Sequence, residues 1–129
     1  MTPNEYIENC LRTENKNLPS PAINGVTPRL EHNILGIAGE SGELIDAMKR
    51  AKVYGKPFDV VNCMEEWGDI AWFISIGLNE IGKTWEDLFE MNIAKLKARF
   101  PDKYSDEKAL NRDLAKERSI LETNEKINL

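Results

Sequence analysis

Cysteine, histidine and long apolar runs are all scarce in this sequence. Cys10 and Cys63 are its two cysteines, and no C-x-x-C pair occurs, which argues against a disulfide framework and against a zinc knuckle. The longest apolar stretch, Ile70 to Leu78, is far shorter than the roughly 20 residues that cross a membrane. Residues 1–12 lack the layout of a secretory signal. We therefore expect a cytoplasmic protein with no membrane partner.

Positive charge is also in short supply. The 129 residues include 22 acidic side chains against 17 lysines and arginines, which gives a net charge of -5 and a pI of about 5.0. This balance argues against a nucleic-acid partner, because binding a phosphate backbone requires an excess of basic residues. With 41% hydrophobic residues, 8 Gly and 6 Pro, the chain is neither fibrous nor of low complexity. Its length predicts a single globular domain over residues 1–129.

Apolar residues recur at helical spacing, and the alternation typical of strands occurs nowhere. Thr2 and Thr27 each precede a proline, which is a typical helix start, and Asp59 is placed to cap a third helix. Gly55 and Pro101 mark helix ends. These signals predict helices over about residues 3–14, 28–53, 60–81 and 84–100. The expected fold is all-α, an antiparallel domain of the four-helix-bundle type.

The sequence changes character beyond Asp102. It is highly charged there, and Leu110, Leu114 and Leu121 provide only a thin apolar stripe. We expect residues 102–129 to form a charged C-terminal extension, either as a further helix that docks elsewhere or as a frayed tail.

The third predicted helix is more apolar than a small bundle can cover. Trp67 lies on its apolar stripe and is expected in the core, and Ile70 to Leu78 is apolar nearly all round. This pattern predicts a homodimer or homotetramer formed through the second and third helices.

Four acidic residues lie on the inward faces of the second and third predicted helices. Glu40 and Glu43 share a face with small residues, while Glu66 and Asp69 continue an apolar seam. The short connection near Gly55 makes the two helices an antiparallel hairpin and brings both acidic pairs to nearly equal height. Close carboxylates repel one another unless they are protonated or bind cations. An all-oxygen set suits Mg²⁺, with Mn²⁺ as a possible substitute, although such pairs also occur on solvated helix faces.

The same residues resemble a family motif. E-x-x-E at Glu40–Glu43, followed some two dozen residues later by E-x-x-D at Glu66–Asp69, is similar to the pattern of the MazG-like all-α nucleoside triphosphate pyrophosphohydrolases. The segment Asn92–Pro101 resembles the final helix of that family, so the resemblance covers about residues 30–101. One departure is Gly39, because many members have a second glutamate directly before the first ligand.

The resemblance implies a Mg²⁺-dependent hydrolase that cleaves the α,β-phosphoanhydride of a nucleoside triphosphate, giving a nucleoside monophosphate and pyrophosphate. It implies catalytic and metal-binding roles for Glu40, Glu43, Glu66 and Asp69, and phosphate binding for Asn92 and Lys95. Spacing does not identify the carboxylate that activates water, or the preferred base and sugar. The alternatives are an enzyme similar to the phosphoribosyl-ATP pyrophosphohydrolases and a non-catalytic helical interaction module.

Overall fold

The computed structural model describes residues 1–127, with side chains described as far as residue 123. The regular secondary structure of this part of the chain is helical, and its only β structure is an isolated bridge between Ile23 and Val26. The expected all-α class is confirmed. None of the described helices is both long and apolar enough to cross a bilayer. The helices are α1 (Pro3–Leu11), α2 (Pro28–Tyr54), α3 (Val60–Glu80), α4 (Trp85–Arg99), α5 (Asp106–Leu110) and α6 (Leu114–Ile127).

The starts of the first three helices agree with the capping signals in the sequence. The Thr2 side chain accepts a hydrogen bond from the Glu5 backbone N–H, and the Glu5 side chain accepts one from Thr2 in return. The side chains of Thr27 and Asp59 cap α2 and α3 by accepting hydrogen bonds from the backbone N–H groups of Leu30 and Asn62, without the reciprocal bond. The first helix is shorter than predicted, because it ends at Leu11 and the chain then forms a turn.

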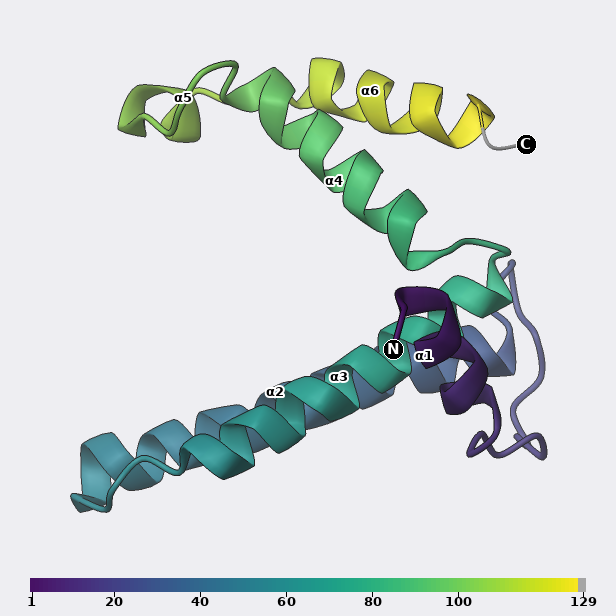
Figure 1. Cartoon of the computed structure of the whole chain (residues 1–129), viewed down its shortest axis with the longest axis vertical. Helices are drawn as coiled ribbons and strands as arrows, with labels where there is room; N and C mark the ends of the chain where they lie inside the picture. The colour runs from purple at the N-terminus through teal and green to yellow at the C-terminus, as the bar shows by residue number, and fades with distance from the viewer. Residues whose placement is uncertain (128–129) are drawn as a thin grey trace. The chain divides into compact units, whose positions relative to one another are not determined.

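The chain divides into two compact units, the first comprising Met1–Thr84 and the second beginning at Trp85. In the first unit, α2 and α3 lie side by side as an antiparallel hairpin (Figure 1). Residues 55–59 connect them, and Gly55 ends α2 with φ = 64°, a left-handed conformation that favours glycine. Helix α1 packs against α3, where the Tyr6 hydroxyl donates to the Gly68 carbonyl oxygen at 3.2 Å.

Helices α2 and α3 approach each other closely at Gly36. A Cβ atom placed there would lie 2.2 Å from the Phe73 ring, so this contact requires glycine. Three residues earlier on α2, the Asn33 side-chain amide donates to the Phe73 carbonyl oxygen, and Asn33 also packs against Gly77. These contacts fix the register in which the two helices face each other.

Burial in the first unit is concentrated where α1 meets α3. The buried apolar side chains there are Ile7, Cys10, Ile76 and Leu78. Towards the 55–59 connection, large apolar side chains of α2 and α3 are instead exposed, and Trp67 is 57% exposed. The expectation that Trp67 belongs to the core is therefore wrong. Its periodic position places it on the apolar stripe of α3, but no described segment of the first unit covers that part of the stripe.

The segment between α1 and α2 is held to the hairpin by an ionic cluster. Arg29 of α2 binds the buried Glu14 carboxylate through Nε at 2.6 Å and Nη2 at 2.9 Å, and it binds Glu80 of α3 through Nη1 at 2.6 Å. The Trp72 indole N–H also donates to the Thr13 hydroxyl at 2.9 Å. These bonds tie the beginning of the segment to both helices of the hairpin.

In the second unit, α6 packs against α4, and the short α5 lies between them in the sequence (Figure 1). Arg99 near the end of α4 forms two hydrogen bonds, each 2.8 Å long, with the carboxylate of Glu117 on α6. The expected charged extension thus begins with two helices, of which α6 docks on α4. Asn128 and Leu129 at its end lie outside the described residues.

Candidate metal site

Three of the predicted carboxylates meet at the middle of the hairpin. Glu40 comes from α2, while Glu66 and Asp69 come from α3, and one carboxylate oxygen of each lies within 4.8 Å of the other two. Glu66 is 7% exposed, Glu40 is half-buried and Asp69 is exposed. The cluster therefore has a buried side against the hairpin and an open side at Asp69.

The electrostatics of this cluster are unfavourable without a cation. Burial raises the pKa of the Glu40 carboxyl group above its ordinary value, and a hydrogen bond shared with Glu66 and the negative charges of Asp69 and Glu66 raise it further. Within residues 1–123, no lysine or arginine forms an ion pair with any of the three carboxylates. The described residues therefore leave this negative charge without a cationic partner.

Asn62 orients the buried member of the cluster. Its side-chain amide donates to Oε1 of Glu66 at 2.7 Å. This bond leaves Oε2 of Glu66 for another partner, and it fixes the carboxylate against rotation. The sequence analysis did not identify Asn62, although its position one helical turn before Glu66 predicts a contact between the two side chains.

The donor set fits a hard divalent cation. It consists of carboxylate oxygens from two packed helices, and such ligands suit Mg²⁺ and Mn²⁺ better than zinc, which favours histidine and cysteine. The raised pKa of Glu40 and the missing cationic partner agree with this fit, because a bound cation would favour all three ionised forms. Glu40, Glu66 and Asp69 are the residues that would hold the metal.

Glu43, the fourth predicted ligand, lies outside this group of three. It is exposed one turn further along α2, and its charge contributes to the raised pKa of Glu40. It lines a recess of about 480 Å³ near the 55–59 connection, together with Asp46, Arg50 and Lys56. The structure therefore places Glu43 outside the three clustered carboxylates, in the lining of a recess to which Asn62 also contributes.

Asn92 and Lys95, the predicted phosphate ligands, lie on α4 in the second unit. Both line a recess of about 400 Å³ whose other walls are apolar and come from α4 and α6. The helical spacing that the sequence suggested for this pair is thus present.

Comparisons of the chain with models of protein families, with curated proteins and with solved structures found no match. A relationship to the MazG-like enzymes therefore stays a hypothesis based on the acidic motifs. Any function must be argued from the geometry of the side chains described above.

Proposed function

We propose that this protein is a Mg²⁺-dependent nucleoside triphosphate pyrophosphohydrolase with a MazG-like bundle fold, which cleaves the α,β-phosphoanhydride to release a nucleoside monophosphate and pyrophosphate. The observation that carries the proposal is the meeting of Glu40, Glu66 and Asp69 without a cationic partner in the described chain. The motif resemblance supplies the reaction class. Mn²⁺ is expected to substitute for Mg²⁺.

A divalent cation in such a site neutralises phosphate charge and lowers the pKa of an attacking water. The residues of the chain have separate parts in this scheme. Glu66 is buried and fixed by Asn62, so it anchors the site to α3. Asp69 is exposed, so it lies on the side from which a substrate approaches. Glu43 is proposed as a further ligand in the substrate-bound state.

The direct test is a panel of nucleoside triphosphates incubated with Mg²⁺ and analysed by phosphorus NMR. We expect pyrophosphate and a monophosphate as the direct products, and no turnover with a chelator of divalent ions. Orthophosphate as the direct product would refute the pyrophosphohydrolase assignment. Hydrolysis of phosphoribosyl-ATP alone would favour the related histidine-biosynthetic activity, and no hydrolysis with no Mg²⁺-dependent stabilisation would favour the interaction module.

Glu66→Gln tests the site itself, with Glu8→Gln as the matched control. Both variants remove one negative charge from the first unit, but Glu8 is exposed on α1 and Glu66 is buried in the cluster. Turnover should fall by orders of magnitude, roughly 10²-fold or more, in Glu66→Gln only. Without metal this variant should be as stable as wild type or more so, because like-charge repulsion is relieved. Mg²⁺ should raise its melting temperature less than that of wild type.

Lys95→Gln tests the role that the resemblance assigns to the Asn92–Lys95 face of α4. If Lys95 binds a substrate phosphate, KM should rise in this variant. Lys97→Gln, an exposed neighbour on the same helix, should leave KM unchanged. Equal kinetic constants in both variants would contradict a phosphate-binding role for Lys95.

We also infer that the protein is a homodimer or homotetramer assembled through α2 and α3. Monomers rarely expose large contiguous apolar patches, yet one stretch of this hairpin leaves many large apolar side chains more than half exposed: Ile45, Met48, Val53, Tyr54, Val60, Val61, Met64 and Trp67. Val61→Glu should reduce the mass measured by light scattering to that of a monomer. Leu110→Glu, an equally exposed control in the second unit, should not change it. A monomeric wild-type mass would refute the inference.

A further inference from the structure

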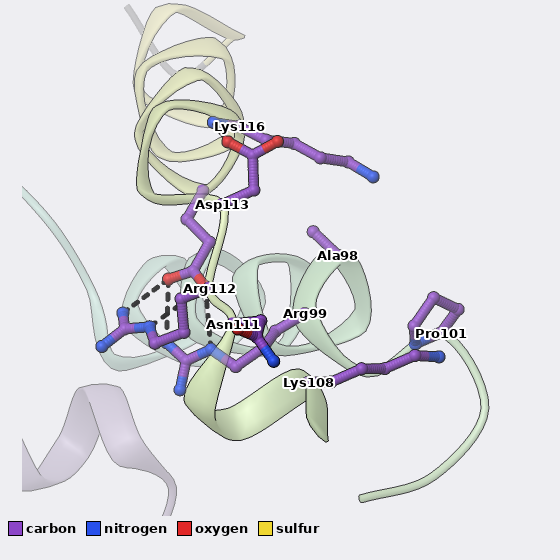
Figure 2. A pocket seen from close by; sticks show the side chains of 9 residues that line it. Ala98, Arg99, Pro101, Lys108, Asn111, Arg112, Asp113 and Lys116 are labelled. Carbon is purple, nitrogen blue, oxygen red and sulfur yellow. Dashed lines mark hydrogen bonds and ion pairs between the residues drawn. The ribbon is translucent and has the colours of Figure 1, made fainter. Parts of the chain in front are cut away.

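A small basic recess lies at the C-terminal end of α4 in the second unit, and none of the residues assigned above lines it. Its volume is about 180 Å³, and its walls come from α4, α5, the connection that follows α5 and the start of α6 (Figure 2). Four of the side chains that line it are cationic, namely Arg99, Lys108, Arg112 and Lys116, and two are anionic, Asp113 and Glu117. The recess therefore carries an excess of positive charge within a chain whose net charge is -5.

Two arginines in this recess are held in place by one buried carboxylate. Glu117 is 4% exposed, and Arg99 and Arg112 both bind its two oxygens, with the shortest contact 2.6 Å from Arg112 Nη2 (Figure 2). These hydrogen bonds hold the pKa of Glu117 well below its ordinary value, so it is ionised at neutral pH. One carboxylate against two guanidinium groups leaves a net positive charge.

The guanidinium groups also retain hydrogen-bond donors. Each binds Glu117 through Nε and Nη2, and within the described residues neither Nη1 group has an acceptor. A guanidinium presents its donors in a planar fork that matches phosphate geometry. Because Glu117 already fixes both side chains, little further ordering is needed for them to bind a ligand.

The two lysines add charge that no described carboxylate neutralises. Within residues 1–123, neither Lys108 nor Lys116 forms an ion pair. Figure 2 shows the Lys108 and Lys116 side chains extending to the side of the recess on which Pro101 lies, while the guanidinium groups of Arg99 and Arg112 lie on the opposite side. The Asp113 carboxylate, by contrast, accepts a hydrogen bond from the Lys116 backbone N–H at 3.0 Å, so it serves as a cap for α6.

From this arrangement we propose that the recess binds a phosphate group, either as inorganic phosphate or as part of a small phosphomonoester. Its excess of two positive charges among the lining side chains matches a dianion. At about 180 Å³ it is smaller than the roughly 300–1,000 Å³ typical of sites for drug-sized ligands. The ligand is therefore a small anion, and the positive lining excludes a metal cation.

The test is isothermal titration of the full chain with inorganic phosphate, in a chelator and at constant ionic strength set with chloride. Without divalent ions the carboxylate cluster does not contribute to phosphate binding, and comparison of the two double variants below distinguishes this recess from the Asn92–Lys95 face. We expect saturable binding that weakens about tenfold or more in the double variant Lys108→Gln/Lys116→Gln. The control Lys97→Gln/Lys103→Gln removes the same charge from exposed positions of the same unit and should bind like wild type.

Two further titrants identify the source and the chemistry. Binding of glycerol 3-phosphate as tight as that of inorganic phosphate assigns the recess to phosphomonoesters, and binding of inorganic phosphate alone assigns it to the free ion. Acetate binding as tightly as phosphate would overturn the proposal, because it would indicate a general anion site. An absence of saturable phosphate binding, or equal weakening in both double variants, would overturn it as well.

Discussion

Substituting Gly36 by alanine tests the close approach of α2 and α3 on which the carboxylate cluster depends. Gly36 lies one turn before Glu40 on α2, and Phe73 lies one turn after Asp69 on α3. An alanine Cβ would lie 2.2 Å from the Phe73 ring. That ring packs edge-on against His32 and Trp72, with centroid distances of 5.3 Å and 5.0 Å. The ring can therefore move aside only by disturbing two other aromatic contacts.

The expected magnitude follows from two opposing effects. Replacing a glycine inside a helix by alanine stabilises a protein by about 1 kcal/mol when space is available. Overpacking of this kind costs about 1–3 kcal/mol. Gly42→Ala on the same helix provides the matched control, because a Cβ there would meet nothing within 4 Å. Gly36→Ala should therefore be less stable than Gly42→Ala by about 1–3 kcal/mol.

Urea denaturation followed by circular dichroism measures this difference, provided that the two variants share one m-value. In a melting experiment it should amount to about 4 °C or more. The Mg²⁺-dependent rise in melting temperature should also be smaller for Gly36→Ala, because a shift of α3 relative to α2 separates Glu40 from Asp69. Equal stability of the two glycine variants would refute the close approach. A lower stability of Gly36→Ala with an unchanged Mg²⁺-dependent rise in melting temperature would show that the metal site does not depend on the close approach at Gly36.

The remaining predictions concern acid, the helix turn and a cap. Burial favours the neutral form of Glu14, but the hydrogen bonds and positive charges of Arg29 and Lys16 together outweigh this effect and lower the pKa of Glu14. Hydrogen bonds from Arg99 and Arg112 lower the pKa of Glu117. Both carboxylates stabilise the fold above their unfolded pKa of about 4.3, and this stabilisation is lost as the pH falls further. The melting temperature should therefore decrease below about pH 4.5. This decrease should be smaller in Glu117→Gln, which lacks one of the two carboxylates. Gly55→Ala should lower the free energy of unfolding by about 1–2 kcal/mol, because Gly55 has φ = 64° and alanine is strained in this left-handed conformation. A free energy of unfolding equal to that of wild type would contradict that conformation. Thr2→Ala should lower it by about 0.5–2 kcal/mol in urea titrations through loss of the α1 cap, whereas Thr2→Ser should not.

Helix starts were predictable because their causes are local. Thr2, Thr27 and Asp59 each cap a helix with a side chain that reaches only three residues along the chain. The meeting of Glu40 with Glu66 was predictable for a related reason. Two helices joined by a short connection pack antiparallel, and residues equally far from that connection then lie opposite each other along the hairpin.

Burial and long-range ion pairs were not predictable in the same way. Periodicity placed Trp67 on the apolar stripe of α3, but whether another element covers that stripe depends on the rest of the fold. The partners of Glu117 are Arg99, on another helix, and Arg112, and no sequence pattern indicates that the three side chains meet. The sequence left the region beyond Asp102 open between a helix and a tail. The side chain of Ser105 caps α5 there, a local signal that sequence reasoning overlooked.

The short connection at residues 55–59 also leads us to expect a particular order of assembly in the first unit. Pairing α2 with α3 closes only this short loop, whereas docking α1 on α3 must bring together residues as distant as Tyr6 and Gly68. The entropy of loop closure grows with the number of residues enclosed, and contacts between near segments form faster. We therefore expect the hairpin to be the first tertiary structure to form, and it contains all three clustered carboxylates. Their mutual repulsion is present from that moment, so divalent cations in the refolding buffer should accelerate hairpin formation as well as stabilise the product.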